Sequence, residues 1–292
     1  MLAALATALL PAAASAGIHV RAHSAIVGGH FAGNGQLPWV VRIVARSGRV
    51  VDGCSGTVVA ANLVLTAGHC VEEVRTGAPR KAADFDVLTA AGETTNKSSR
   101  VSRVIVYPGF DRKSGVGDAA LLQLSTPAGA PSIQLASQAK DWAAGTPAVM
   151  AGWGRDGVAT STASPSLLRW ANTVVQSPES CAARLRGFHA GRELCAMNAP
   201  SDNTAGCAGD SGGPLLVERG AVTFEIGVLD GSVVRGSKVI RCLTTEPTVY
   251  ASSSVISGWV REWIQRLNYV PIAVTEGASP ASGELRHSFP QL

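Results

Sequence analysis

Charged and aromatic side chains are scarce in this sequence. Charged residues make up 16% of the 292 residues, and aromatic residues make up 5%. The 25 Lys and Arg residues only slightly outnumber the 21 Asp and Glu residues, and the basic residues form no run of five or more. Proteins that bind nucleic acid usually gather Lys and Arg into a patch or a stripe. The scattered charge indicates an ordinary solvated surface, and we expect no nucleic-acid partner.

Long apolar runs are missing after the N-terminus, so we expect no membrane anchor and no membrane partner. The first 16 residues, MLAALATALLPAAASA, are apolar but too short to cross a bilayer, and they end in an Ala-x-Ala-like cleavage site. The basic residues that normally open a signal peptide are lacking, since the first is Arg21. A disordered Ala-rich arm is the alternative. We expect a signal peptide over 1–16 and secretion to the extracellular space or the periplasm.

The cysteines lack the spacing of a metal site. The chain has six cysteines but no Cys-x-x-Cys pair, so we expect no metal, and nothing in the sequence implies another cofactor. In an exported protein such cysteines form disulfides. Six cysteines allow 15 pairings, which the sequence alone does not separate. Pairing of nearest neighbours would give Cys54–Cys70, Cys181–Cys195 and Cys207–Cys242.

Long helical patterns are also scarce, and the body of the chain consists of short β-type runs. Clusters of Gly, Pro, Asn and Ser separate these runs. The runs are WVVRIV (39–44), TVVAANLVLT (57–66), VSRVIVY (101–107), AALLQL (119–124), AVMAGW (148–153), WANTVVQ (170–176), PLLV (214–217) and VTFEIGVL (222–229). Many short strands favour antiparallel barrels or sandwiches. The Pro-, Gly- and Ser-rich passage 125–138 divides the body near its middle and is a candidate connection between two units.

One amphipathic helix is predicted near the end of the chain. In the stretch SSVISGWVREWIQRLN (253–268), apolar residues recur at steps of three and four. These residues are Ile256, Trp259, Val260, Trp263, Ile264 and Leu267. The periodicity ends after Leu267, and we expect a mobile tail over 268–292.

Three short stretches contain the residue types that nucleophilic catalysis requires. They are CAGDSGGP with Ser211, VLTAGHC with His69, and GDAALLQL with Asp118. A serine hydroxyl is a weak nucleophile, so it needs a base, a group that orients the base, and donors that hold developing negative charge. A lone histidine before a cysteine is more often structural, a lone aspartate before an apolar run is more often a cap or turn residue, and GDSGGP alone could be a loop. Together, in the order His, Asp, Ser, they resemble the chymotrypsin/trypsin-fold serine endopeptidases over about residues 26–267.

This resemblance implies an all-β fold of two antiparallel six-stranded β-barrels with a C-terminal α-helix, the barrels covering about 26–135 and 136–267. It implies a secreted monomeric peptidase that acts on proteins or peptides through an acyl-enzyme and that protein inhibitors could block. His69, Asp118 and Ser211 would be the catalytic triad, and the N–H groups of Gly209 and Ser211 would form the oxyanion hole.

The stretch IVGG at 26–29 resembles the mature amino terminus of this family. In the family a freed α-amino group pairs with the aspartate before the nucleophile, which here implies an ion pair between Ile26 and Asp210. We therefore expect a propeptide over 17–25 and a zymogen. Residue 25 is an alanine rather than the Arg or Lys common in the family, so a trypsin-like activator would not cut there.

The substrate pocket implied by the resemblance departs from trypsin. Ala205 lies six residues before the nucleophile, where trypsin-like members carry Asp, and Thr248 replaces a glycine on the pocket wall. With Gly206 and Ser232, these residues predict an elastase-like preference for a small or medium uncharged residue before the cut bond.

The segment GVLDGS (227–232) matches the family's Ser-Trp-Gly stretch poorly, and an ungapped reading puts Asp230 at the serine position. If Asp230 pointed into the pocket, cleavage after Arg or Lys would be the alternative. A catalytically inactive homologue that acts as a binding protein is a second alternative. An α/β-hydrolase esterase would need the order Ser, Asp, His, which the chain lacks.

Overall fold

The computed structural model describes most of the chain between residues 26 and 267. The described ranges are 26–47, 50–73, 76–91, 95–138, 142–154, 167–198, 204–231, 242 and 244–267. The expected signal peptide (1–16), propeptide (17–25), tail (268–292) and pocket residue Ser232 lie outside the described residues. No helix within the described ranges is long and apolar enough to cross a membrane.

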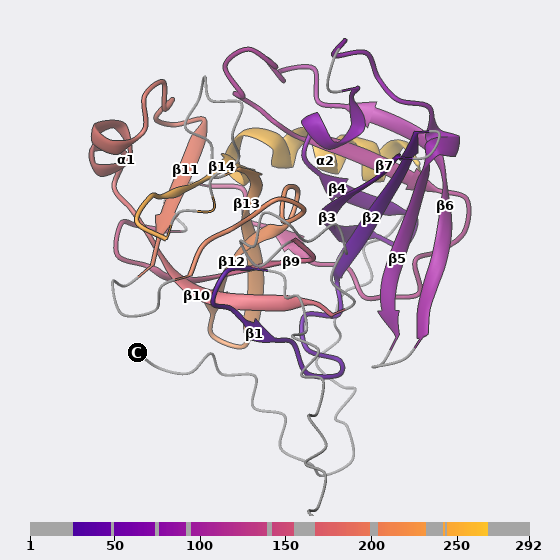
Figure 1. Cartoon of the computed structure of the whole chain (residues 1–292), viewed down its shortest axis with the longest axis horizontal. Coiled ribbons are helices and arrows are strands. Elements are labelled where there is room, and N and C mark those ends of the chain that lie inside the picture. The colour runs from indigo at the N-terminus through magenta and orange to yellow at the C-terminus, as the bar shows by residue number, and fades with distance from the viewer. Residues whose placement is uncertain are drawn as a thin grey trace, which may run out of the picture.

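Six antiparallel strands close into a first barrel, drawn in indigo to magenta in Figure 1. They are β2 (Val40–Ser47), β3 (Val50–Ala60), β4 (Leu63–Thr66), β5 (Phe85–Ala91), β6 (Thr95–Val106) and β7 (Ala120–Leu124). The ring order is β2-β3-β4-β7-β6-β5, and pairing of β2 with β5 closes it. Val41, Ile43 and Ala45 enter the barrel core because every second residue of a strand points to the same face.

A second ring of six strands contains the rest of the predicted β-type runs. It consists of β9 (Pro147–Gly152), β10 (Arg169–Val175), β11 (Glu193–Met197), β12 (Pro214–Arg219), β13 (Val222–Gly231) and β14 (Thr248–Ser252). Pairing of β9 with β10 closes the ring. Two short strands extend it, since β1 (His30–Phe31) pairs with β10 and β8 (Gln134–Leu135) runs parallel to β13. The prediction of two six-stranded antiparallel barrels is confirmed.

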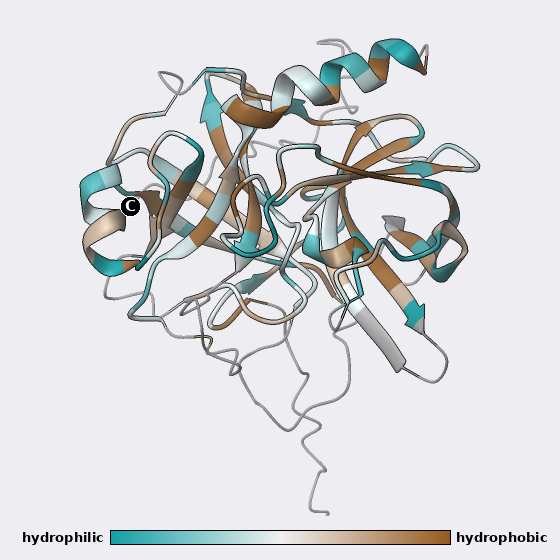
Figure 2. Cartoon of the chain, turned by 90° about the horizontal axis from the view of Figure 1, so that it is seen from above, coloured by the Kyte–Doolittle hydropathy of each residue, from teal (hydrophilic) through white to brown (hydrophobic). Residues whose placement is uncertain are grey.

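The predicted C-terminal helix is α2 (Ser253–Arg266), and it packs on both barrels. Ile256 and Val260, one helical turn apart, are buried in one cluster with Leu63 of the first barrel and Val228 of the second. The polar and apolar residues of the helix alternate along its length in Figure 2, as expected for a helix with one buried face.

Several elements differ from the expectations drawn from sequence. The run 57–66 is interrupted by a turn at 61–62, so it forms the end of β3 and all of β4. Strands β5, β11 and β14 were not predicted, and neither was helix α1 (Pro178–Arg184). With seven residues, α1 is too short to show a periodic pattern. Its start follows capping rules, since the Ser177 side chain accepts the N–H of Ser180 and Pro178 occupies the first turn.

Candidate active site

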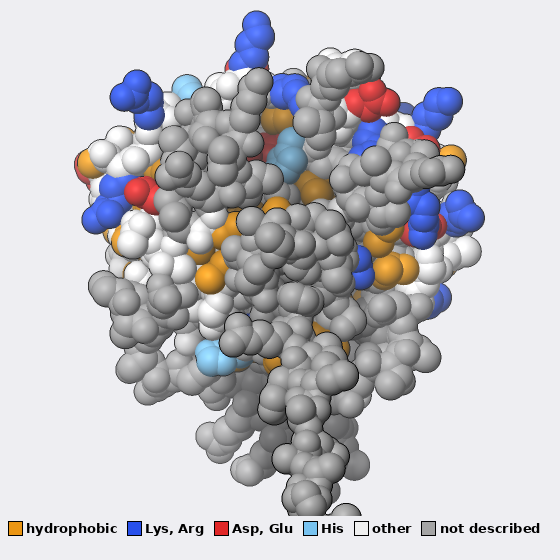
Figure 3. All heavy atoms as spheres, in the orientation of Figure 1, with side chains coloured by type: hydrophobic (Ala, Val, Ile, Leu, Met, Phe, Trp, Pro, Cys, Tyr) orange, Lys and Arg blue, Asp and Glu red, His pale blue; other side chains and the backbone are white. Residues whose placement is uncertain are grey.

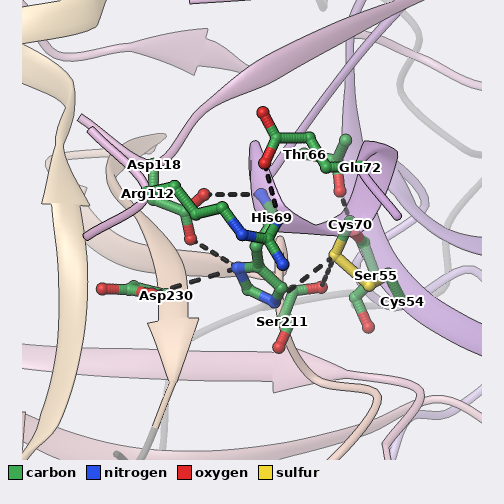
Figure 4. A network of polar contacts seen from close by, with 10 residues as sticks. All are labelled: Cys54, Ser55, Thr66, His69, Cys70, Glu72, Arg112, Asp118, Ser211 and Asp230. Atoms are coloured by element: carbon green, nitrogen blue, oxygen red, sulfur yellow. Dashed lines mark hydrogen bonds and ion pairs between the residues drawn. A yellow bond between two sulfur atoms is a disulfide. The ribbon is translucent and has the colours of Figure 1, made fainter. Parts of the chain in front are cut away.

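The ends of two paired strands bring His69 and Asp118 together. Strand β4 pairs with β7 so that Thr66 faces Ala120, and the chain passes from β4 into the 3-10 turn η1 (His69–Val71). Asp118 lies two residues before β7, so it leaves the same end of this strand pair. The Nδ1 atom of His69 lies 2.5 Å from Oδ2 of Asp118, and the backbone N–H of His69 donates to Oδ1 at 2.7 Å (Figure 4). One hydrogen bond from the ring and one from the backbone N–H thus fix His69 on the carboxylate.

This pair combines a buried acid with a partly exposed base. The Asp118 side chain is 1% exposed, whereas that of His69 is 36% exposed. Burial is the largest single effect and lowers the pKa of His69, because it disfavours the protonated ring. The charge and hydrogen bond of Asp118, together with the charge of Asp230, outweigh burial and raise the pKa of His69 to about 9. Burial alone would raise the pKa of Asp118, yet the charge and hydrogen bonds of His69 hold it below its ordinary value.

Ser211 reaches this pair from the second barrel. It lies in the turn that precedes β12, and in Figure 4 it sits beside the imidazole on the side away from Asp230. Among the described contacts, no hydrogen bond joins Ser211 Oγ to the imidazole. Hydrogen bonds of this kind are often long in a free enzyme and tighten when substrate binds.

Ser55 of β3 ties the Ser211 loop to the first barrel. Its backbone N–H donates to the Ser211 carbonyl at 2.8 Å, and its hydroxyl donates to the Gly209 carbonyl at 2.9 Å. The same hydroxyl accepts the N–H of Trp153 at 2.8 Å. Because Ser55 is fully buried, these bonds hold the loop without competition from water.

The loop conformation depends on glycine at two positions. Gly209 and Gly212 have φ of +99° and +82°, where side chains are strained. A Cβ on Gly212 would lie 2.2 Å from Thr66 Oγ1 and 2.3 Å from the Ser55 carbonyl oxygen. Among the described contacts, the N–H groups of Gly209 and Ser211 have no acceptor, while the neighbouring N–H groups at 210, 212 and 213 do. The two N–H groups on either side of Asp210 in the chain therefore have no acceptor among the described contacts.

Asp210 is buried beside the start of the described chain. Its carboxylate accepts the N–H groups of Gly154 at 2.7 Å and Cys207 at 2.8 Å, and also the backbone N–H of Ile26. Burial raises the pKa of Asp210 to about 7, although these hydrogen bonds counteract the shift. Ile26 is fully buried and has φ of +50°, a strained value for a β-branched residue.

The described pocket residues of the prediction lie together. Ala205 exchanges two backbone hydrogen bonds with Val27, at 2.9 and 3.2 Å, which places it next to Ile26. A Cβ added to Gly206 would lie 3.4 Å from Thr248 Cγ2 and 3.1 Å from Leu229 Cδ1. The Thr248 side chain therefore occupies space beside Gly206, and it is buried at the start of β14.

Disulfides join the three pairs of nearest neighbours, namely Cys54–Cys70, Cys181–Cys195 and Cys207–Cys242. The first bond links β3 to the turn that carries His69. The third bond lies just ahead of Asp210 and Ser211. Two of the three bonds therefore brace segments that carry candidate site residues.

Asp230 takes a position that sequence reasoning did not assign to it. Its Oδ1 lies 3.9 Å from His69 Nδ1 (Figure 4), and one of its carboxyl oxygens lies within 4.8 Å of an Asp118 oxygen. The carboxyl thus faces the His69–Asp118 pair, so we do not assign it to the pocket. The ungapped alignment with the family's Ser-Trp-Gly stretch was the signal that could have located it. The 2.5 Å contact between His69 and Asp118 leaves no space for an ion between their atoms, and we assign no metal here.

Comparison with known proteins agrees with this geometry. A family model described as Trypsin matches residues 26–260. Serine protease 56 of Mus musculus is 33% identical over 258 residues, which is 83% of this chain but only 39% of that protein. Trypsin alpha of Drosophila melanogaster is 29% identical over 237 residues, covering 80% of this chain and 86% of that protein. Fibrinolytic enzyme isozyme C of Lumbricus rubellus is 30% identical over 251 residues, covering 80% of this chain and 98% of that protein. The chain belongs to the trypsin family of serine proteases.

Proposed function

We propose that this protein is a secreted serine endopeptidase in which Ser211 is the nucleophile, His69 the general base and Asp118 the residue that orients the base. One observation carries the proposal. A histidine held on a buried carboxylate by one hydrogen bond from its ring and one from its backbone N–H lies beside a serine whose loop comes from the other barrel. Three disulfides fit an oxidising compartment outside the cytoplasm.

In each half of the proposed reaction, His69 first accepts one proton and then gives it away. His69 Nε2 takes the proton of Ser211 as Oγ bonds to the substrate carbonyl carbon, and the imidazolium then gives that proton to the leaving amine. Water then attacks the acyl-enzyme in the same way, with its proton passing to His69 and from His69 to the departing Ser211 oxygen. The free N–H groups of Gly209 and Ser211 would hold the negative oxygen of each tetrahedral intermediate, where one donor stabilises by about 3 kcal/mol.

We also propose that the chain is a zymogen activated by a cut before Ile26. In the uncut chain an amide N–H, which has no charge, faces the buried Asp210 carboxyl. Cleavage would turn this amide into an ammonium group that can pair with the ionised carboxylate, and such pairing is what makes a buried charge tolerable. Release of the strained φ at Ile26 would favour the cut form further.

The pocket residues support a preference for small or medium uncharged side chains before the cut bond. Ala205 offers no charge to a basic side chain, and Thr248 narrows the space beside Gly206. Cleavage after Arg or Lys remains the alternative. It would require Asp230 to turn away from His69.

Protein or peptide substrates and protein inhibitors are the proposed partners, and the proposed state is a monomer. We propose no nucleic-acid partner, in agreement with the described Lys and Arg side chains, which are spread around the face in Figure 3 instead of forming one patch. We propose no metal or other cofactor for the reaction.

A fluorophosphonate or sulfonyl fluoride probe tests the enzyme proposal directly. Protein cut before Ile26 is expected to form one adduct, located on Ser211 by mass spectrometry, and the uncut chain is expected to react far more slowly. The variant Ser211→Ala is the control that must not react. Cut wild-type protein that gives no adduct would favour an inactive homologue that acts as a binding protein.

A peptide library then tests the specificity proposal. Cut protein is expected to cleave after Ala, Val, Ser or Leu. Dominant cleavage after Arg or Lys would contradict the assignment of Ala205 to the base of the pocket.

A further inference from the structure

A β-bulge directs the Asp230 side chain toward the candidate active site. Strand β13 pairs with β14 through Leu229 opposite Tyr250 and Gly231 opposite Val249, and the register shifts between these two pairs. Asp230 lies between these two pairs, at the register shift itself. Bulges re-aim side chains and occur next to active sites. The bulge therefore explains why this carboxyl faces the first barrel.

The carboxyl makes close contacts with both members of the pair that orients the base. One donor atom each of Asp230, Asp118 and His69 lies within 4.8 Å of the other two. Oδ1 of Asp230 is 3.9 Å from Nδ1 of His69, on the same ring nitrogen that Asp118 bonds. The Asp230 side chain is 18% exposed, so water only partly screens this interaction.

Within the described part of the chain, one cation opposes the two carboxyls. Arg112, from the loop between β6 and β7, lies close enough to His69 to disfavour the imidazolium. Its guanidinium also bonds Glu72 Oε2 at 2.6 Å, and this acid follows η1 directly. Because Glu72 offsets much of the Arg112 charge, the charged side chains that face His69 from the described residues sum to a negative potential at Nδ1.

We propose that Asp230 is a positioning residue that supplies a second carboxyl to His69 and shifts peptidase activity toward alkaline pH. The inference rests on the proposed function. A base must be neutral to take the proton of Ser211, and a second negative charge near Nδ1 stabilises the imidazolium instead. The ungapped alignment places Asp230 where the family has a serine, and a serine hydroxyl would add no such charge. The pKa of about 9 for His69 agrees with this geometry, since Asp230 is among the groups that raise it.

The first experiment measures kcat/KM against pH for protein cut before Ile26. Asp230→Ser and Asp230→Asn both remove the charge, and both are expected to move the acid limb of the profile to lower pH by about one unit. The same shift is expected in the pH profile of kcat, because Asp230 still lies beside His69 when substrate is bound and kcat reports the pKa of His69 in that complex. The matched control is Glu262→Gln on the exposed face of α2, which removes one charge far from His69 and is expected to leave the limb in place.

The second experiment titrates His69 by NMR in labelled full-length chain that carries Ser211→Ala. Adding Asp230→Asn is expected to lower the midpoint by about one unit. This readout needs no catalysis, so a lowered midpoint, found together with cut wild-type protein that has no peptidase activity, would refute the proposed function and leave the contact of Asp230 with His69 intact. A midpoint that does not move overturns the inference. A midpoint that moves while the acid limb of an active enzyme stays in place overturns the link to catalysis.

Discussion

At the scale of single residues, Glu225 is a buried acid outside the candidate active site. It lies on β13 with no exposed surface, and its Oε2 accepts the hydroxyl of Thr57 on β3 at 2.7 Å. Its Oε1 has no hydrogen-bond partner among the described atoms. Burial raises the pKa of Glu225 to about 8. The carboxyl is therefore neutral in the folded protein at neutral pH, and it bridges the two barrels as a hydrogen-bonding group.

This burial makes stability depend on pH. In the unfolded chain the Glu225 carboxyl loses its proton near its ordinary pKa of 4.5, whereas in the folded chain it loses the proton only near pH 8. The folded state is therefore destabilised relative to the unfolded state as pH rises from about 4.5 to 8. Glu225→Gln cannot ionise. Relative to wild type, its free energy of unfolding should rise between pH 5 and pH 8 by on the order of 2–4 kcal/mol.

Urea unfolding in the Ser211→Ala background, which prevents self-digestion, measures this difference. Glu262→Gln is the control, since the Glu262 side chain is 62% exposed and pairs with Arg266 on the same helix. A Glu225→Gln variant with the same pH dependence as wild type would contradict the assignment.

At the scale of elements, helix α2 joins the two barrels through one apolar face. Ile256 has no exposed surface, and its cluster contains residues of β4, β7 and β13. The edge of the Trp259 ring also meets Tyr107, with centroids 5.2 Å apart. A helix of 14 residues is marginal in isolation, so this face rather than helix propensity holds it in place.

Truncation of Ile256 should therefore weaken the whole fold. Ile256→Ala is expected to cost about 2–5 kcal/mol of unfolding free energy, because it leaves a cavity between helix and barrels. Arg261→Ala, on the exposed face of the same helix, is expected to change stability by less than about 0.5 kcal/mol. Equal losses in the two variants, measured by urea unfolding, would show that the helix does not anchor the barrels.

At the scale of the whole molecule, the candidate site exists only where the two barrels meet. His69 and Asp118 come from the first barrel, and Ser211 and Asp230 come from the second. Ser55 of the first barrel binds the Ser211 loop, while Ile26 and Val27 bind Asp210 and Ala205 of the second. The start of the described chain therefore contacts both the nucleophile loop and the pocket.

Activation should depend on this contact. Asp210→Asn is expected to lower kcat/KM of the cut protein by about 100-fold, because the ammonium of Ile26 would lose its charged partner and the oxyanion donors would lose their order. The same change is expected to have little effect on the slow labelling of the uncut chain. Equal activity of cut wild type and cut Asp210→Asn would contradict the proposed ion pair.

The sequence by itself determined the strands that show clear β-type runs, the periodic helix α2, and the identity and order of His69, Asp118 and Ser211. These features are local, since a pattern of period two or 3.6 and a short motif are readable without knowledge of what lies across the fold. The sequence left the pairing of the six cysteines open among 15 possibilities, and the structure selects the pairs of nearest neighbours. The short helix α1 escaped because its seven residues are too few to show a period.

Only the tertiary structure decided where Asp230 and Glu225 point. Both lie on β13, and the direction of each side chain depends on a pairing register with strands far away in sequence. The bulge at Asp230 turns its carboxyl toward His69, and the closure of two barrels on each other buries Glu225 against Thr57. A motif identifies which residues can do the chemistry. Long-range strand pairing sets the charges around them, and with them the pH at which that chemistry proceeds.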